Sequence, residues 1–233
     1  MNFIPLHPSR LDAVIVDLDG TMVDTMGDFN EALNRMLREL GLPAIEAERI
    51  ESMVGKGSEH LLRSVINHVL APMDKAQAAI KIEAMFPQTW ASYQRHYLEI
   101  NGSYSAVYPG VVEGLTALQG AGLRMACLTN KPLSFARPLL QAKGLAGFFG
   151  QVFGGDSFER KKPDPLPLLK TCEALGSQPA RTLMVGDSSN DAQAARAAGC
   201  PVVLVTYGYN HGQPVRGVDA DGYVDALSAL LGR

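Results

Sequence analysis

Two aspartates separated by a single residue follow an apolar segment. Asp17 and Asp19 follow the run AVIV in the stretch AVIVDLDGT, and Gly20 comes directly after them. Two carboxylates this close repel each other unless a positive charge lies between them. A divalent cation would supply that charge, and a carboxylate at the same place can attack an electrophile. The pair therefore indicates a reaction centre.

Polar residues of matching chemistry recur at three later places in the chain. Thr129 and Asn130 end the segment RMACLTN, Lys162 lies in KKPDP, and Asp187 and Asp191 lie in VGDSSND. The aspartates are hard oxygen donors of the kind that Mg²⁺ prefers. A hydroxyl, an ammonium and backbone N–H groups suit a phosphoryl group, whose transition state carries charge on several oxygens. The set predicts Mg²⁺-assisted phosphoryl chemistry, with Thr129, Asn130 and Lys162 binding the phosphate.

The two aspartates of the first stretch should have different roles. Asp17 closes the apolar segment and should be rigidly held, so we expect it to attack phosphorus and form an aspartyl-phosphate. Gly20 permits a sharp turn and leaves space beside the phosphate. That turn lets Asp19 point back toward the leaving oxygen, where it can act first as general acid and then as general base.

Taken alone, each of these residues also has a structural interpretation. Asp191 could cap the helix that follows it, and Lys162 could be a solvated surface lysine. Asn130 could hold a turn before Pro132. The joint pattern favours the chemical interpretation, because every group lies at a predicted strand end or in the adjoining loop.

Four short apolar segments predict parallel strands that are buried on both faces. They are residues 13–17, 124–130, 182–187 and 201–208. Helical patterns lie between the last three of these strands, at 135–145, 165–176 and 191–199, and a final helix is expected at 224–232. The alternation predicts an α/β fold, an open parallel Rossmann-like sheet flanked by helices. Ligands of such sheets bind outside the carboxyl ends of the strands, so the polar residues should converge there.

The segment between the first two predicted strands is too long for a single crossover. From residue 22 to about 104, apolar residues recur at helical spacing, as at Phe29, Leu33 and Leu37. We therefore expect an inserted α-helical cap subdomain at 22–104. The α/β core would then consist of residues 1–21 and 105–233.

The composition is that of an ordinary globular protein. Of the 233 residues, 46% are hydrophobic and 19% are charged, and the net charge is -3. No apolar run approaches the roughly 18 residues of a membrane span, and no basic cluster exceeds the short run at 160–162, which includes the pair at 161–162. We expect a cytoplasmic protein without nucleic-acid or membrane partners, either a monomer or a homodimer.

The four motifs DLDGT, LTNKP, KKPDP and VGDSSND together resemble those of the haloacid dehalogenase superfamily. The resemblance implies Asp17 as nucleophile and Asp19 as general acid and base, with Thr129 and Lys162 as phosphate binders. Dehalogenase members lack the second aspartate and the metal. The presence of Asp19 therefore favours a phosphatase within this superfamily.

The same resemblance implies where Mg²⁺ would bind. Its ligands would be the carboxylates of Asp17 and Asp187 and the backbone carbonyl of Asp19. Asp191 would support the ion indirectly, through water or through the other ligands. The helical segment after the first motif is similar to a cap that closes over small soluble substrates.

Within the superfamily, the chain most resembles the phosphoglycolate phosphatases. The similar stretches are NKP, GDSSNDAQAARAAG, VTYGYNHG and, in the cap, the glycine-rich specificity loop VGKGSEHLL. The resemblance implies hydrolysis of 2-phosphoglycolate, a small phosphorylated metabolite, to glycolate and phosphate. Lys56 and the N–H groups near Ser58 could meet its carboxylate, with Gly55 and Gly57 shaping the loop. Alternatively, the two glycines only form a turn and Lys56 is solvated.

Several other activities fit the same motifs. A phosphosugar phosphatase or phosphomutase and a pyrophosphatase would use the same aspartates. A phosphonoacetaldehyde hydrolase would use a cap lysine, and Lys56 lies in the right region. A non-catalytic phosphoryl-binding protein is an alternative of another class, but every position that the chemistry needs is occupied.

Overall fold

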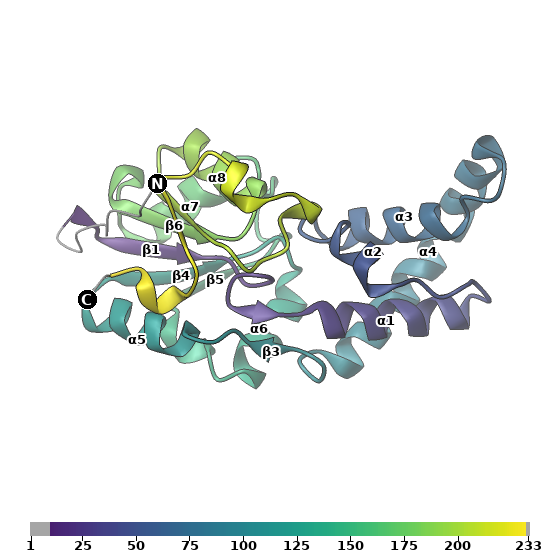
Figure 1. Cartoon of the computed structure of the whole chain (residues 1–233), viewed down its shortest axis with the longest axis horizontal. Helices are drawn as coiled ribbons and strands as arrows, with labels where there is room; N and C mark the ends of the chain where they lie inside the picture. The colour runs from purple at the N-terminus through teal and green to yellow at the C-terminus, as the bar shows by residue number, and fades with distance from the viewer. Residues whose placement is uncertain (1–9, 232–233) are drawn as a thin grey trace.

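The centre of the molecule is a parallel sheet of six strands in the order β5-β4-β1-β6-β7-β8 (Figure 1). The structure is a computed structural model, and it describes residues 10–231. The strands are β1 (Ala13–Val16), β4 (Arg124–Leu128), β5 (Gln151–Phe153), β6 (Thr182–Gly186), β7 (Val202–Val205) and β8 (Gly222–Val224). β1 lies between β4 and β6, so the residues that follow these three strands meet at the carboxyl ends of the strands.

The residues of β1 explain why it occupies the centre of the sheet. All four side chains are fully buried, with Val14 and Val16 in the hydrophobic cluster on one face and Ala13 and Ile15 in the cluster on the other. A strand covered on both faces needs an uninterrupted apolar sequence. The register pairs Val16 with residues of both β4 and β6, and the three strands therefore end level with one another.

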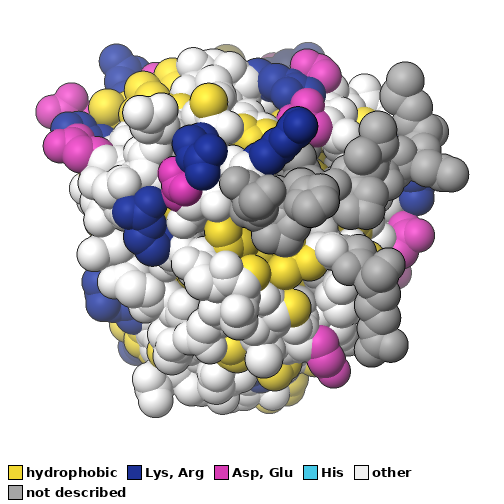
Figure 2. Space-filling view, turned by 90° about the vertical axis from the view of Figure 1, so that its left-hand side faces the viewer, with side chains coloured by type: hydrophobic (Ala, Val, Ile, Leu, Met, Phe, Trp, Pro, Cys, Tyr) yellow, Lys and Arg dark blue, Asp and Glu magenta, His cyan; other side chains and the backbone are white. Residues whose placement is uncertain are grey.

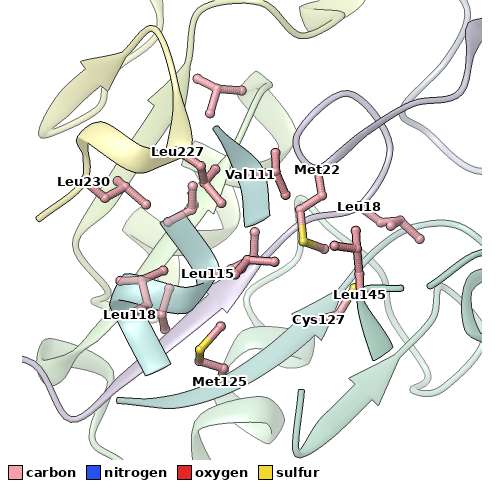
Figure 3. Close-up of a cluster of buried hydrophobic side chains, with 14 of the residues drawn as sticks. Leu18, Met22, Val111, Leu115, Leu118, Met125, Cys127, Leu145, Leu227 and Leu230 are labelled. Atoms are coloured by element: carbon pink, nitrogen blue, oxygen red, sulfur yellow. The ribbon is translucent and has the colours of Figure 1, made fainter. Parts of the chain in front are cut away.

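Helices cover both faces of the sheet (Figure 1). The helices of one face are α5 (Val111–Gly120) and α6 (Leu133–Ala142), and those of the other face are α7 (Leu166–Leu175) and α8 (Ser189–Ala198). Figure 3 shows the cluster under α5, where Leu115 and Leu118 approach Met125 of β4 and Leu227 of the C-terminal segment. These contacts fix the two layers against the central strands.

Between β2 (Val23–Asp24) and β3 (Ala106–Val107) the chain forms four helices that project to one side of the sheet (Figure 1). They are α1 (Met26–Glu39), α2 (Ala47–Glu51), α3 (Ser58–Val69) and α4 (Lys75–Ile100), and we call residues 26–100 the helical insert. The insert has a hydrophobic cluster of its own, to which Phe135 of α6 and Tyr209 add from outside. The two connections to the insert, β2 and β3, pair as an antiparallel ribbon.

The four predicted strands are confirmed, but the edges of the sheet differ from expectation. β5 and β8, with three residues each, were not predicted. The helix expected at 224–232 is wrong, and its last residue lies outside the described part. Val224 ends β8 and pairs with Val205, and only a short 3₁₀ turn at Leu227–Ala229 follows. The same apolar residues fit either structure, and the free edge of β7 favours the strand.

The surface of the core carries both signs of charge. Figure 2 shows the face opposite the helical insert, where basic and acidic side chains are interspersed instead of forming one basic stripe. Within residues 10–231, no helix combines the length and the apolar character that a membrane crossing requires.

The packing of α5 against the C-terminal segment leads to a prediction about two glycines of one helix. A Cβ on Gly114 would lie 2.6 Å from the Leu227 carbonyl carbon, whereas a Cβ on Gly120 would have nothing within 4 Å. We expect Gly114→Ala to lower the free energy of unfolding by about 1–3 kcal/mol through overpacking. Gly120→Ala should leave it unchanged or raise it by up to about 1 kcal/mol, from helix propensity. Urea unfolding of both variants measures this, and equal effects would contradict the packing argument.

Candidate active site

Most of the sequence-predicted residues line one cavity between the strand ends and the helical insert, whereas Lys162 and Asp191 lie behind its wall and Lys56 lies outside it. The structure places Asp17, Asp19, Thr129, Asn130 and Asp187 in its wall on the side of the strand ends. The insert contributes Gly55, Gly57 and Ser58 to the same wall. The cavity has a volume of about 40 Å³.

Three buried carboxylates form the most highly charged part of this site. Oxygens of Asp17, Asp187 and Asp191 all lie within 4.8 Å of one another. Burial, with the negative charge of Asp191 adding to it, raises the pKa of Asp17 to about 7 in spite of the nearby Lys162. Burial and the charges of Asp191 and Asp17 also raise the pKa of Asp187 well above its ordinary value.

These carboxylates fit a divalent cation. If all three are ionised, their summed charge exceeds that of the one ammonium among them, Lys162, by two units. Hard oxygen ligands and an uncompensated negative charge are what a cation such as Mg²⁺ requires. The donor set therefore matches the metal that the sequence predicts.

Lys162 is a buried part of the site, so its interpretation as a solvated surface lysine is wrong. Its Nζ lies 3.0 Å from Asp17 Oδ1 and 2.7 Å from Asp191 Oδ1, and it donates to the Leu128 carbonyl at 3.0 Å. Burial by itself lowers the pKa of Lys162, but the charges of the two aspartates outweigh it and raise that pKa above its ordinary value. The ammonium therefore stays charged beside Asp17.

Asp191 both caps a helix and belongs to the carboxylate cluster. Its Oδ2 accepts hydrogen bonds from the Ser188 hydroxyl at 2.7 Å and the Ser188 N–H at 3.1 Å, at the start of α8. Its Oδ1 accepts from Lys162. Because donors already occupy both oxygens, Asp191 is better placed to fix its neighbours than to act as a free ligand.

The carboxylate of Asp19 turns away from this cluster. Its Oδ1 accepts hydrogen bonds from the Thr25 hydroxyl at 2.9 Å and from Lys131 Nζ at 3.0 Å. It is therefore held in the cavity wall at a different place from Asp17. The backbone of the turn supports this arrangement, since Gly20 has a φ of 79°.

Gly20 also leaves the space that the sequence analysis expects at the turn. A Cβ on Gly20 would lie 2.2 Å from Asp187 Oδ2, a distance no side chain tolerates. The same oxygen accepts a hydrogen bond of 2.8 Å from the Tyr209 N–H. The close approach of the first turn to Asp187 thus depends on glycine.

Three residues outside the insert bind the backbone of the glycine-rich loop. The side-chain amides of Asn130 and Asn190 donate to the Gly55 carbonyl at 3.1 and 3.0 Å, and His211 Nδ1 donates to the Val54 carbonyl at 2.8 Å. The Asn130 amide also donates to the Lys162 carbonyl at 2.8 Å. Asn130 therefore uses its side chain to connect loops.

Lys56 lies outside the cavity that its neighbours line. Its side chain is exposed and borders an open outer groove together with His60 and Lys161. Helix α3 begins at Ser58, and its N-cap is Gly57, with a φ of 90° and no side-chain cap. The loop thus presents glycine backbone and Ser58 to the cavity, and its lysine to the outer groove.

Tyr93 and Lys131 are among the cavity-lining residues that sequence reasoning missed. Lys131 is part of the LTNKP motif, but nothing in that motif shows that its side chain is buried. Tyr209 and His211, which also line the cavity, belong to the loop YGYNHG, for which the sequence leaves a site loop and a surface loop equally open. Tyr93 is indistinguishable in the sequence from other apolar positions of a helix.

Comparisons with known proteins agree with this geometry. The family model of the haloacid dehalogenase-like hydrolases matches residues 11–199. A phosphoglycolate phosphatase of Thiobacillus denitrificans is 46% identical over 221 residues, which cover 95% of this chain and 94% of that protein. One of Nitrosospira multiformis is 44% identical over 94% of both chains. The crystal structure of a predicted phosphoglycolate phosphatase from Haemophilus somnus superposes with a TM-score of 0.87, at 30% identity over 95% of this chain and 97% of that chain.

The close approach at Gly20 predicts how the carboxylate cluster responds to one added methyl group. Gly20→Ala should displace Asp187 and weaken Mg²⁺ binding at least about ten-fold, the range seen when a ligand's support is lost. Titration calorimetry of metal-free protein with MgCl₂ measures the affinity. The matched control is Gly41→Ala, because Gly41 also has a positive φ, of 65°, but open space around it. Equal affinities in the two variants would show that the contact with Asp187 is unimportant.

Proposed function

The chain belongs to the haloacid dehalogenase-like hydrolase family, and we propose that it hydrolyses 2-phosphoglycolate to glycolate and phosphate with the help of Mg²⁺. The observation that carries the proposal is the buried cluster of Asp17, Asp187 and Asp191 beside Lys162, next to the cavity that Asp17 and Asp187 line. The relatives named phosphoglycolate phosphatases support the choice of substrate. Their identity with this chain extends over nearly all of it.

Asp17 is the nucleophile in the proposed reaction. It follows the central strand, and its Oδ1 accepts from the Leu18 N–H at 2.7 Å, so its side chain is held in one orientation. Lys162, 3.0 Å away, favours the ionised carboxylate that attack on phosphorus requires. Attack forms the bond from the Asp17 oxygen to phosphorus and breaks the bond from phosphorus to the glycolate oxygen.

Asp19 moves the proton in both half-reactions. It first donates a proton to the departing glycolate oxygen, and it later takes one from the water that attacks the aspartyl-phosphate. That second step releases phosphate and restores Asp17. Thr25 and Lys131 hold the Asp19 carboxylate in the cavity wall during both steps.

Asp17, Asp187 and the Asp19 backbone carbonyl would hold the Mg²⁺, with Asp191 keeping its neighbours in position. When bound, the ion supplies positive charge that stabilises the negative oxygens of the transferring phosphoryl group. Thr129 and Lys162 add a hydroxyl and an ammonium to the same group. Asn130 contributes by connecting the phosphate-binding loop to Gly55.

In this proposal the helical insert is the main part of a cap domain. The cap consists of residues 22–104 and moves against a core of 1–21 and 105–233. Opening would admit substrate, and closure would exclude water from the aspartyl-phosphate. The hydrogen bonds from Asn130, Asn190 and His211 to the loop at 54–55 stabilise the closed arrangement. The β2–β3 ribbon is the natural hinge, since both connections pass through it. A cytoplasmic location stays a prediction.

The test of the proposal is phosphate release from 2-phosphoglycolate and from a panel of other phosphate esters. We expect 2-phosphoglycolate to be the preferred ester, and we expect EDTA to stop the reaction and added MgCl₂ to restore it. The panel should include a hexose phosphate and pyrophosphate. A preference for either of those would retain the aspartate chemistry and refute the substrate.

The control for this measurement is Asp17→Asn, which keeps the shape of the side chain and removes its nucleophilic charge. Its turnover should fall at least about 10³-fold, the order of loss seen when a nucleophile is removed. Rapid quench of the unaltered protein should trap phosphate on Asp17. Full turnover in the variant would refute the covalent mechanism.

The contacts at Gly55 predict a separate effect of weakening cap closure. Asn190→Ala removes one hydrogen bond to the loop, which contributes about 0.5–1.5 kcal/mol. We expect KM for 2-phosphoglycolate to rise about 2- to 10-fold, because closure becomes less favourable. Asn67→Ala is the control, since Asn67 is exposed on α3 and far from this contact. An unchanged KM in Asn190→Ala would contradict a closing role for the loop.

A further inference from the structure

Part of the cavity wall belongs to the apolar cluster of the helical insert instead of the strand ends. Phe29, Leu61, Tyr93 and Phe135 line the cavity and are members of that cluster, and Lys131 lines the cavity beside them. None of these five residues is needed to attack phosphorus. They are available to contact the part of the substrate that carries the phosphate.

Tyr93 brings a hydroxyl into this wall without a partner for it. The side chain is fully buried in α4, and its hydroxyl meets the geometry of a hydrogen bond with no residue in the described range 10–231, although the Ser58 side chain in the same wall lies near enough to lower its pKa slightly. Burial, with the charges of Asp19 and Asp28 adding, raises the pKa of Tyr93 well above its ordinary value. The phenol therefore stays protonated. A buried polar group left unpaired is unfavourable, and a ligand with an acceptor oxygen would remove that penalty.

Lys131 places a positive charge at the same wall. Among the described residues that line the cavity, it is the one lysine or arginine. Its Nζ donates to Asp19 and, at 2.6 Å, to the Tyr97 hydroxyl, and lies 4.7 Å and 4.5 Å from the ring centres of Phe29 and Tyr97. The contacts fix the buried ammonium between the Asp19 carboxylate and two aromatic rings, where water screens its charge poorly.

A phenol donor and a buried ammonium together select a small anionic group. We propose that Tyr93 and Lys131 form the subsite that binds the carboxylate of the substrate, an inference that rests on the function proposed above. Both groups donate hydrogen bonds, and a carboxylate accepts several. The aromatic rings of Phe29 and Phe135 exclude water around it.

This subsite differs from the expectation that Lys56 binds the carboxylate. Lys56 is exposed in the outer groove, whereas Lys131 is 5% exposed and lines the cavity. Binding through Lys131 also places the substrate beside Asp19, because the same ammonium contacts Asp19 at 3.0 and 3.2 Å. Binding of the carboxylate then also places the leaving oxygen near Asp19, the proposed general acid.

The experiment compares kcat/KM for 2-phosphoglycolate, ethyl phosphate and 2-hydroxyethyl phosphate. The second ester replaces the carboxylate by a methyl group, and the third replaces it by a neutral hydroxymethyl group. In Tyr93→Phe we expect the preference for 2-phosphoglycolate over ethyl phosphate to fall at least ten-fold. The variant should unfold at the same or a higher temperature, because it loses an unpaired hydroxyl. Tyr223→Phe, whose hydroxyl donates to the Val218 carbonyl outside the cavity, should leave the preference unchanged.

Lys131→Gln is a second, independent variant. Any effect of losing the contact with Asp19 should fall on all three esters, so the ratio of kcat/KM values isolates recognition. We expect this ratio to fall at least ten-fold as well, and we expect Lys56→Gln to change it less than either of the other two variants.

The outcomes separate the two proposals. If the unaltered protein prefers 2-phosphoglycolate and both variants keep that preference, the subsite is refuted and the function stands. A loss confined to 2-hydroxyethyl phosphate would also refute the subsite, since it would assign Tyr93 to a neutral group. If the unaltered protein shows no preference for 2-phosphoglycolate, the function and the subsite are both refuted.

Discussion

The structure depends on placing three carboxylates within 4.8 Å of one another in a buried site. Their repulsion and burial raise the pKa values of Asp17 and Asp187, and only one ammonium, Lys162, lies among them in the described chain. Such a cluster is stable only if surrounding donors and a bound cation offset its charge. Neighbouring residues and the register of the strands allow the cluster to form. Gly20 leaves room for Asp187, Ser188 donates to Asp191, and the level ends of β1, β4 and β6 hold the groups at one edge.

The helical insert contacts these charged strand ends through aromatic side chains and through the hydrogen bonds to the loop at 54–55. Phe135 and Tyr209 belong to the insert's cluster although they come from outside it, so the contact between insert and core buries apolar surface on both sides. Lys131 joins the two parts, since it contacts Asp19 on one side and Tyr97 on the other. A lysine in this position connects the state of the insert with the position of the proposed general acid. The chemistry of the strand ends and the choice of substrate are therefore physically linked.

The fold was predictable where local sequence and tertiary structure agree. β1, β4, β6 and β7 are continuous apolar runs because they are covered on both faces, and that pattern identifies them in the sequence. The edge of the sheet was not predictable. β8 has three residues, and the segment that contains it carries an apolar pattern that fits a helix equally well. Its conformation is decided by the free edge of β7, which belongs to a different part of the chain.

The sequence by itself determined the chemistry: which aspartates, which hydroxyl and which strand ends would meet, because residue type and strand position are local properties. Only the tertiary structure decided what each lysine does. Lys56, Lys131 and Lys162 are alike in the sequence, but one is exposed in an outer groove, one is buried against aromatic rings, and one is buried among carboxylates. The solvation of a charge depends on neighbours that are distant along the chain. The same holds for Tyr93, whose burial is set by the packing of the insert's cluster, to which Phe135 adds from outside.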